Sequence, residues 1–168
     1  MSVEIVLIGP PGLGKSSVAK SLAKRTGNRY VDTDKVIGDR SGKSIAEMFL
    51  EDGEKHFRTV ESDVVLRTLE GKDEIVALGG GSVLSEVIQE KLKKFSPIIY
   101  LEVSISNAAP RVGFNRERPL LLGNPRAQWL ALMEIRRPIY ESLATFKVST
   151  DNKKPDQVTS DILELVKL

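Results

Sequence analysis

The stretch IVLIGPPGLGKSS, residues 5–17, decides the fold that we expect for this chain. It opens with a short apolar run, and Gly9 to Ser16 then fit the pattern G-x-x-x-x-G-K-[ST] in full. Apolar residues recur at helical spacing beyond the loop, at Val18, Leu22 and Ala23. The stretch therefore predicts a buried strand, a phosphate-binding loop and the first turns of a helix.

The residues of this loop have separate expected tasks. Its glycines let the backbone turn N–H groups inward around phosphate oxygens, where the helix N-terminus adds a partial positive charge. Lys15 is placed to reach the β and γ phosphates of a nucleotide, and the Ser16 hydroxyl can coordinate Mg²⁺. A glycine-rich turn capped by a serine is the alternative, which the complete motif in this context disfavours. The predicted nucleotide-binding residues of the loop are Gly12, Leu13, Gly14, Lys15, Ser16 and Ser17.

The composition is that of an ordinary globular domain. The chain has 168 residues, of which 40% are hydrophobic and 29% charged, enough for one domain with its own core. The 25 basic and 23 acidic side chains nearly balance, which argues against a nucleic-acid partner. Because there is no cysteine, disulfides and thiol catalysis are excluded. No basic leader with a long apolar stretch opens the chain, so we expect one cytoplasmic domain over residues 1–168, with no membrane partner.

Short apolar runs alternate with helical patterns along the rest of the chain. Continuous apolar runs are typical of strands buried on both faces, and their alternation with helices predicts a parallel sheet in a three-layer α/β/α sandwich. The predicted strands are Val3–Ile8, Arg29–Val31, Glu74–Leu78, Ile98–Val103 and Phe146–Val148. The predicted helices are Ser16–Thr26, a short one from Ser44 to near Gly53, Glu54–Leu69, one that Pro125 opens and Pro138 kinks or ends, and one that Pro155 opens.

Ligands of a parallel sheet collect at the carboxyl ends of its strands. Asp32 and Asp34 follow the second predicted strand. There one can hold Mg²⁺ through water and the other can accept a proton from an attacking hydroxyl. A helix N-cap is the alternative role for Asp34. Residues 79–81, three glycines after the third strand, either let a ligand lie directly on the backbone or form a tight turn.

Arginines occur at three further places of interest. Arg58 and Glu61, three residues apart on one helical face, form either a solvated ion pair or an arginine oriented for bidentate carboxylate binding. The stretch 112–124 carries Arg118 and has the character of a lid that brings an arginine to a transferred phosphoryl group, with an exposed loop as the alternative. Arg136 and Arg137 could equally cap the end of the helix before them.

Taken together, these residues resemble the shikimate kinase family, whose members are small-molecule kinases related to nucleoside monophosphate kinases. Six motifs match that family in order along nearly the whole chain. They are GPPGLGKS at 9–16, DTD at 32–34, FRTVE at 57–61, GGG at 79–81, RPLL at 118–121 and RRPIY at 136–140. The resemblance implies a five-stranded parallel sheet in the order 2-3-1-4-5, with a substrate-binding region at about 34–62 and a lid at about 112–124.

The resemblance also implies an activity, the ATP-dependent phosphorylation of the 3-hydroxyl of shikimate, which gives shikimate 3-phosphate and ADP on the route to chorismate and the aromatic amino acids. Asp34 would contact the acceptor hydroxyl, and Lys15 and Arg118 would face the transferred phosphate. Ser16 would bind Mg²⁺ directly and Asp32 through water. The implied substrate-binding residues are Asp34, Arg58, Glu61, Gly80, Gly81 and Arg136, and the implied adenine-side contacts are Arg111 and Lys153.

Three other functions were weighed against this one. A gluconate kinase with the same loop is the nearest rival, and the DTD, FRTVE and RRPIY motifs argue against it. A GTPase-like switch needs N-K-x-D and a D-x-x-G after the third strand, where this chain has glycines instead. A nucleotide-binding protein without catalysis is not supported, because every expected catalytic position is filled. Pro110 departs from the family pattern by breaking or bending a helix there, and no apolar stripe is left over, so a monomer is expected.

Overall fold

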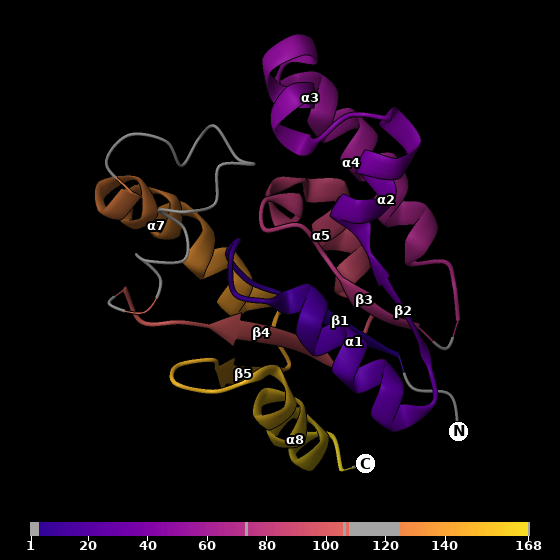
Figure 1. The fold of residues 1–168 in the computed structure, drawn as a ribbon, viewed down its shortest axis with the longest axis vertical. Coiled ribbons are helices and arrows are strands. Elements are labelled where there is room, and N and C mark those ends of the chain that lie inside the picture. The colour runs from indigo at the N-terminus through magenta and orange to yellow at the C-terminus, as the bar shows by residue number, and fades with distance from the viewer. Residues whose placement is uncertain (1–3, 73, 106, 108–124, 168) are drawn as a thin grey trace.

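The computed structural model describes residues 4–72, 74–105, 107 and 125–167 (Figure 1). Arg111, Pro110, Arg118 and the predicted lid at 112–124 lie outside the described residues. Of the sequence motifs, RPLL at 118–121 is therefore the one whose placement is not described, and the other five can be located in the fold.

Five parallel strands form one sheet in the order β2-β3-β1-β4-β5, which confirms the topology that the family resemblance implied. Their bounds are β1 Ile5–Ile8, β2 Arg29–Asp32, β3 Glu74–Ala77, β4 Ile98–Glu102 and β5 Phe146–Ser149. Ile5 is in register with Ile75 of β3, and Val6 with Ile98 of β4, so β1 lies at the centre of the sheet. The phosphate-binding loop that follows β1 is thereby placed in the middle of the carboxyl edge.

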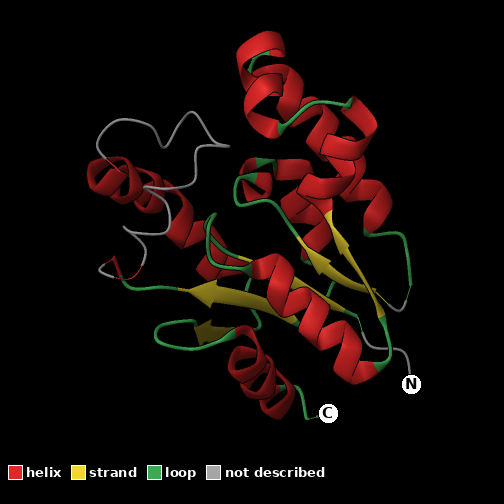
Figure 2. Cartoon of the chain, viewed as in Figure 1, coloured by secondary structure: helices red, strands yellow, loops and turns green. Residues whose placement is uncertain are grey.

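The side chains of β1 alternate between two hydrophobic clusters, one on each face of the sheet. Ile5 and Leu7 pack on one face with residues of α1 (Lys15–Thr26) and α8 (Pro155–Leu165). Val6 and Ile8 pack on the other face. That face is covered by α4 (Glu54–Thr68), η1 (Ser82–Leu84), α5 (Glu86–Leu92) and α7 (Pro125–Leu143). Helices thus cover both faces, and the three-layer sandwich is confirmed (Figure 2).

Two short helices, α2 (Thr33–Ser41) and α3 (Ile45–Asp52), lie against α4 at the top of Figure 1. They bury a small apolar cluster of their own with α4, made of Ile37, Ile45, Met48, Phe57 and Val64. This cluster is separate from the two that flank the sheet. The region predicted to bind substrate, about 34–62, is therefore a helical unit set on the edge of the sheet that holds β2.

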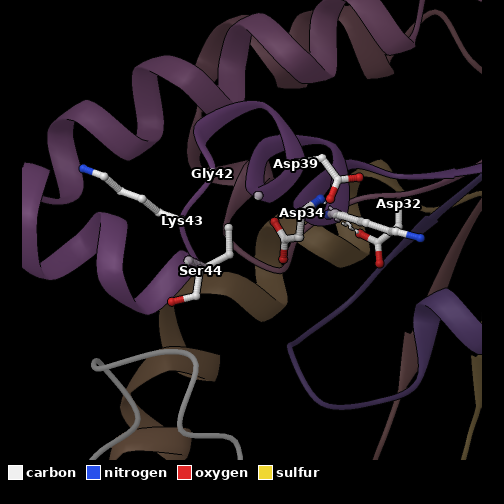
Figure 3. Close-up of a pocket in the computed structure, with 9 residues that line it drawn as sticks. Asp32, Asp34, Asp39, Gly42, Lys43 and Ser44 are labelled. Carbon is white, nitrogen blue, oxygen red and sulfur yellow. Dashed lines mark hydrogen bonds between the residues drawn. The ribbon is translucent and has the colours of Figure 1, made fainter.

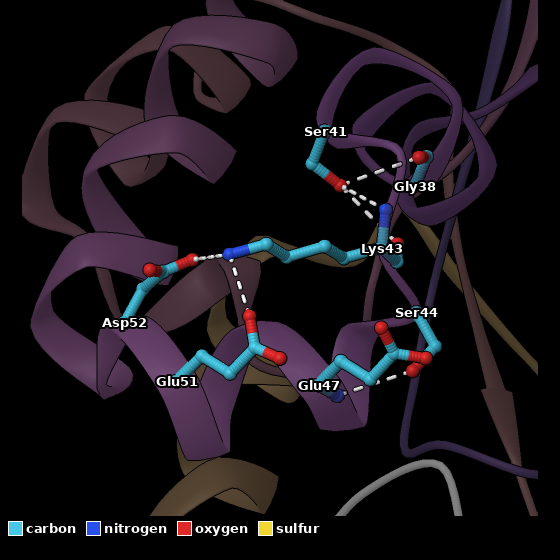
Figure 4. A network of polar contacts seen from close by, with 7 residues as sticks. All are labelled: Gly38, Ser41, Lys43, Ser44, Glu47, Glu51 and Asp52. Carbon is cyan, nitrogen blue, oxygen red and sulfur yellow. Dashed lines mark hydrogen bonds and ion pairs between the residues drawn. The ribbon is translucent and has the colours of Figure 1, made fainter.

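The connection between α2 and α3 is held by polar contacts (Figure 4). Ser44 caps α3 by accepting from the N–H of Glu47 at 3.1 Å, as the sequence predicted. The ammonium of Lys43 reaches across to the far end of α3, 2.8 Å from Oε2 of Glu51 and 3.1 Å from Oδ2 of Asp52. Because two carboxylates at a helix C-terminus are unfavourable to the helix dipole, the Lys43 charge stabilises the end of α3.

The helix α7 does not end at Pro138 but continues to Leu143. Proline removes one backbone hydrogen bond of the helix, yet Trp129, Met133 and Tyr140 on either side of it are buried in the sheet cluster. Burial of these large side chains holds the helix together across the proline. Within the described residues, no helix has the length and apolar character required to cross a membrane.

Candidate active site

The phosphate-binding loop closes tightly onto the sheet. Gly9 has a φ of +145°, and a Cβ there would lie 2.5 Å from the carbonyl oxygen of Leu101, so only glycine fits. Gly14 caps α1 with a φ of +78° and without a side-chain hydrogen bond, which leaves the first N–H groups of the helix facing the loop. The ammonium of Lys15 donates to the carbonyls of Gly9 and Pro10, each at 2.8 Å. This geometry is an anion cradle with a lysine folded over it.

Ser16 and Asp32, the predicted Mg²⁺ residues, contact each other. The Ser16 hydroxyl donates to Oδ2 of Asp32 at 2.7 Å. The other oxygen of Asp32 accepts from the backbone N–H groups of Asp34 and Lys35, at 3.0 and 3.3 Å. Asp32 is therefore the N-cap of α2, and the alternative that gave this role to Asp34 is wrong. Capping holds Asp32 in place while its second oxygen stays turned toward the phosphate-binding loop.

Asp34 lies in the first turn of α2 and faces two adjoining cavities. One, of about 210 Å³, is lined by the phosphate-binding loop together with Asp32, Asp34, Ala77 and Leu78. The other, of about 480 Å³, runs along α2 past Gly38 and Gly42 to Ser44 (Figure 3). Asp34 thus lines both cavities, and neither Arg58 nor the glycine segment 79–81 is among the lining residues of the larger one.

The three glycines after β3 touch three different parts of this site. A Cβ on Gly79 would lie 2.5 Å from Oδ1 of Asp34, and one on Gly80 would lie 2.9 Å from the Cδ of Pro11. A Cβ on Gly81 would collide with the guanidinium of Arg58. No positive φ is recorded at these positions, so glycine is required there for space rather than for backbone conformation. Because these three residues have no side chains, the Asp34 carboxylate, the phosphate-binding loop and the Arg58 guanidinium can all approach the backbone closely.

Arg58 is held on several sides. Its Nη1 lies 2.8 Å from Oε1 of Glu61, and its Nη2 lies 3.6 Å from Oε1 of Glu54. Its guanidinium carbon stands 5.2 Å from the ring centre of Phe57 and 5.9 Å from that of Phe49, within the range of cation–π attraction. The alternative of a solvated ion pair is wrong, because the side chain of Glu61 is only 2% exposed.

Burial raises the pKa of Glu61, and the nearby Asp34 carboxylate adds to this rise. The charge and hydrogen bond of Arg58 lower the pKa, and the hydroxyl of Ser82 acts in the same direction. A buried carboxylate that must stay charged needs such partners. Glu61 therefore depends on its neighbours for the charge with which it holds Arg58.

Of the two adjacent arginines on α7, the structure separates Arg136 from Arg137. Arg136 is buried, with 6% of its surface exposed, whereas Arg137 is exposed and lies beside the Tyr100 hydroxyl. Because α7 continues to Leu143, neither arginine caps its C-terminus. One turn beyond Arg136, the Tyr140 hydroxyl donates to the carbonyl of Gly80, which ties α7 to the glycine segment.

Lys153, the predicted adenine-side residue that is described, lies beside the phosphate-binding loop. It lines a cavity of about 240 Å³ together with Gly12, Leu13, Gly14, Val18, Thr150, Pro155 and Val158. Its ammonium is 2.7 Å from Oδ2 of Asp161. Leu13 is buried and packs against α1, which accounts for its apolar side chain in a loop. Ser17, also predicted to bind nucleotide, is exposed on the first turn of α1.

Three residues near the site were not predicted by sequence reasoning. The Thr33 hydroxyl accepts from the N–H of Gly79 at 3.2 Å, Tyr140 holds Gly80, and Ser82 lies beside Glu61. Each is part of a motif, or next to one, that was noted for its charged or glycine residues. Their positions inside or beside the motifs DTD, RRPIY and GGG were the only sequence signal that could have placed them near the site.

A phosphate-binding loop, a carboxylate at the carboxyl edge of a parallel sheet, a half-buried Arg58 and a buried Arg136 define a P-loop kinase of small molecules. A family model described as shikimate kinase matches residues 11–167, and the chain belongs to that family. It is a kinase that uses ATP as co-substrate and transfers phosphate to shikimate.

Relatives and solved structures cover nearly the whole chain. The shikimate kinase of Thermobifida fusca (strain YX) is 48% identical over 152 residues, which are 90% of this chain and 88% of that protein. The shikimate kinase of Streptomyces coelicolor is 44% identical over 164 residues, 98% of this chain and 95% of that one. A structure of shikimate kinase from Acinetobacter baumannii in complex with shikimate matches with a TM-score of 0.94 and 31% identity, over 98% of this chain and 92% of that chain.

Proposed function

We propose that the chain transfers the γ-phosphoryl group of ATP to the 3-hydroxyl of shikimate beside Asp34, between the phosphate-binding loop and Arg58. The observation that carries this assignment is the glycine segment 79–81. Its three residues touch Asp34, the phosphate-binding loop and Arg58 in turn. A small acid with a ring hydroxyl fits this arrangement, with its carboxylate at the arginines and its hydroxyl between Asp34 and the phosphate.

Arg58 and Arg136 are proposed to bind the carboxylate of the acceptor. Glu61 fixes one nitrogen of the Arg58 fork, and the two aromatic rings limit its movement. Fixing the fork in advance lowers the entropy lost when a carboxylate is bound in bidentate fashion. The backbone at Gly80 and Gly81, which adjoins Pro11 of the loop and the Arg58 guanidinium, is proposed to line the same acceptor site.

The reaction forms a bond between the acceptor oxygen and the γ phosphorus and breaks the bond from that phosphorus to the β–γ bridging oxygen, which leaves with ADP. Asp34 accepts the hydrogen bond of the attacking hydroxyl and then its proton. Because the transition state of phosphoryl transfer is loose, positioning and charge supply most of the rate enhancement. Lys15, and Arg118 outside the described residues, are proposed to offset the charge on the transferred group.

Ser16 and Asp32 are proposed to hold Mg²⁺, the first directly and the second through water. Mg²⁺ keeps several waters and binds through few protein oxygens plus nucleotide phosphates, which fits two oxygen donors 2.7 Å apart at the end of the loop. When bound, Mg²⁺ would neutralise charge on the nucleotide phosphates. In keeping with such a shared ion, the described residues contain no group of three or more His, Cys, Asp or Glu suited to holding a metal by themselves.

The base of the nucleotide is proposed to lie in the cavity lined by Leu13 and Lys153, with Arg111 as a further contact.

We also propose that the chain is one domain, that it works as a monomer in the cytoplasm, and that it binds neither nucleic acid nor membrane. The large apolar side chains that are exposed in the described residues are spread over several elements, as on Leu50 of α3, Val87 of α5 and Leu165 of α8. Light scattering of the purified protein tests the monomer.

The assignment is tested by measuring ADP release from ATP and Mg²⁺ with shikimate or gluconate as acceptor. Release that depends on shikimate, with phosphorus detected on its 3-oxygen by NMR, supports the proposal. Release that depends on gluconate, or phosphorylation at another hydroxyl, contradicts it. Arg58→Ala is the companion variant, expected to raise the KM for shikimate far more than the KM for ATP.

A further inference from the structure

Ser82 is a fully buried polar residue whose backbone N–H and carbonyl are hydrogen-bonded without its side chain. It is 0% exposed and begins η1, immediately after Gly81. Its N–H donates to the carbonyl of Gly79 at 3.1 Å, and its carbonyl accepts from the N–H of Ser85 at 3.2 Å. The hydroxyl is therefore not a helix cap, since Ser85 caps the helix that follows.

The Ser82 hydroxyl lies beside the carboxylate of Glu61 and favours its charged form. Within the described part of the chain, neither Ser82 Oγ nor Glu61 Oε2 makes a hydrogen bond of standard geometry, although both atoms are buried. Unsatisfied buried polar atoms are uncommon in native proteins and call for an explanation. Because the Ser82 side chain lies near the Glu61 carboxylate and α4 packs against η1, these two atoms are most simply explained as a donor and an acceptor that pair after a small rotation of the serine side chain.

The two oxygens of Glu61 then have separate partners. Oε1 binds Nη1 of Arg58 at 2.8 Å, and Oε2, which has no hydrogen-bond partner among the described residues, is left for the Ser82 hydroxyl. If Oε2 were unsupported, burial and the Asp34 carboxylate would favour protonation of Glu61. A protonated Glu61 holds Arg58 weakly, and Glu54, half exposed on the other side of the guanidinium at 3.6 Å, would compete for it.

We propose that Ser82 is a positioning residue for the acceptor-carboxylate site: its hydroxyl donates to Oε2 of Glu61 and so keeps Oε1 on Arg58. The inference rests on the proposed function, because it takes Arg58 as the group that binds the acceptor carboxylate. Ser82 itself does not touch the reacting atoms. Its effect passes through Glu61 to Arg58, and the adjoining Gly81 leaves room for the guanidinium.

Steady-state kinetics of Ser82→Ala test the proposal. We expect the KM for shikimate to rise about three- to tenfold, as for the loss of one ordinary hydrogen bond, because Ser82 acts on Arg58 only through Glu61, with the KM for ATP changed by less than about twofold. Ser85→Ala is the matched control, because that serine lies in the same segment and its hydroxyl caps α5 by accepting from the N–H of Ile88. It should lower the thermal midpoint and leave both KM values unchanged. An unchanged KM for shikimate in Ser82→Ala, or an equal rise in both KM values, overturns the proposal.

A double-mutant cycle with Glu61→Gln tests whether Ser82 acts through Glu61. If it does, Ser82→Ala has no further effect on the KM for shikimate once Glu61 is replaced. Full additivity of the two effects overturns the proposal. Ser82→Cys, of similar size and with a weaker donor, gives an intermediate KM and provides the readout should the alanine variant fold poorly.

The pH profile supplies a signature that a merely structural serine would not have. Removing the Ser82 hydroxyl takes away one influence that lowers the pKa of Glu61, so the acid limb of kcat/KM for shikimate should move to higher pH in Ser82→Ala. An unmoved limb counts against the proposal. Arg58→Ala distinguishes a failure of the proposed acceptor site from a failure of the role of Ser82. If Arg58→Ala leaves the KM for shikimate unchanged, the proposed acceptor site is wrong. If Arg58→Ala raises this KM strongly but Ser82→Ala does not change it, only the role of Ser82 is contradicted.

Discussion

Gly81 lies where any side chain would meet the guanidinium of Arg58, and the two glycines before it are confined in the same way by Asp34 and Pro11. At the scale of single residues, the site depends on three glycines, whose lack of a side chain leaves space for the functional groups around them. The hydrogen atom of each glycine sets how closely a functional group approaches the backbone. Substitutions in this segment should therefore disturb different functions, depending on which neighbour a methyl group would displace.

Alanine at each of the three glycines should give three distinct kinetic defects. Gly79→Ala displaces Asp34 and should mainly lower kcat, Gly80→Ala pushes on the phosphate-binding loop and should raise the KM for ATP, and Gly81→Ala displaces Arg58 and should raise the KM for shikimate. Each defect should be about tenfold or more, since small displacements of positioning groups have large effects on rate and binding. Steady-state kinetics with both substrates varied checks this.

Gly71→Ala is the comparison for these variants. A Cβ there would meet the Glu74 side chain, far from the site at the start of β3. It should leave kinetics unchanged. An identical pattern of defects in all three site variants would show that general loosening of the segment, rather than the individual contacts, governs the effects.

The charge on buried Glu61 should make stability depend on pH in a definite direction. Its pKa is raised in the folded protein, so the native state binds more protons than the unfolded state between the ordinary carboxyl value of 4.5 and the raised value. Stability from this group is therefore complete below the ordinary value and is lost as the pH rises through the folded pKa. Glu61→Gln carries no such charge, and its stability relative to the parent should improve as pH rises across this window.

Urea unfolding at a series of pH values measures this difference. Asp63→Asn is a suitable control, because Asp63 is an exposed residue of the same helix. A Glu61→Gln difference that is flat with pH, or that falls as pH rises, would contradict the raised pKa.

At the scale of elements, α2 and α3 are a helical unit attached to the sheet through α4 and capped by Asp32 and Ser44. Asp32 serves two purposes, since one oxygen begins α2 and the other contacts Ser16 beside the loop. The start of the substrate-binding unit and the nucleotide site thus share one carboxylate. A movement of α2 would be transmitted directly to the residues proposed to hold Mg²⁺.

Lys43→Ala should loosen α3 without unfolding the sheet. The variant leaves Glu51 and Asp52 together at the C-terminus of α3 without the ammonium that neutralises them. We expect faster amide hydrogen exchange in α3 and a thermal midpoint lower by about 1–3 °C, since the side chains are partly exposed.

Lys93→Ala, which removes an exposed pair with Glu90 on α5, is the matched control. It should leave exchange in α3 unchanged. If exchange accelerates equally in α3 and in the central strands of the Lys43 variant, the contact stabilises the whole fold and not this connection alone.

At the scale of the whole molecule, both proposed ligand sites lie along one edge of the sheet, because parallel strands end there and the phosphate-binding loop leaves the central strand. The two sheet clusters form most of the core, and the α2–α4 cluster belongs to the region proposed to bind the acceptor. Binding of both substrates should therefore stabilise the entire domain rather than one half of it.

Saturating ligands should raise the thermal midpoint in one cooperative transition. At a ligand concentration of 100 times Kd the gain is about 2.7 kcal/mol, or roughly 5–10 °C for a domain of this size. Differential scanning fluorimetry with ADP, Mg²⁺ and shikimate measures it. EDTA alone should leave the midpoint of the unliganded protein unchanged, because Mg²⁺ is proposed to bind with the nucleotide; a large drop would indicate a structural metal.

Local patterns in the sequence predicted the strands, the bounds of α1, α3 and α4, the first residues of α7 and α8, the phosphate-binding loop and the Ser44 cap, but gave no bounds for α2 and α5. These features depend on residues within a few positions of one another, whose periodicity and turn chemistry can be read directly. The strand order came from the resemblance carried by six ordered motifs, five of which lie in the described residues. Ends of strands and the continuation of α7 past Pro138 departed from expectation, because they depend on packing against other elements.

Only the tertiary structure decided which of two similar residues does what. Asp32 rather than Asp34 caps α2, Arg136 rather than Arg137 is buried, and Glu61 lies beside Ser82 instead of in solvent. The Asp32 cap is a local contact whose choice over Asp34 follows from where β2 ends, whereas the other two outcomes depend on elements far apart in the chain that meet near the glycine segment 79–81. Burial and charge environment are properties of that meeting, so they arise only when β3, α4 and α7 pack together.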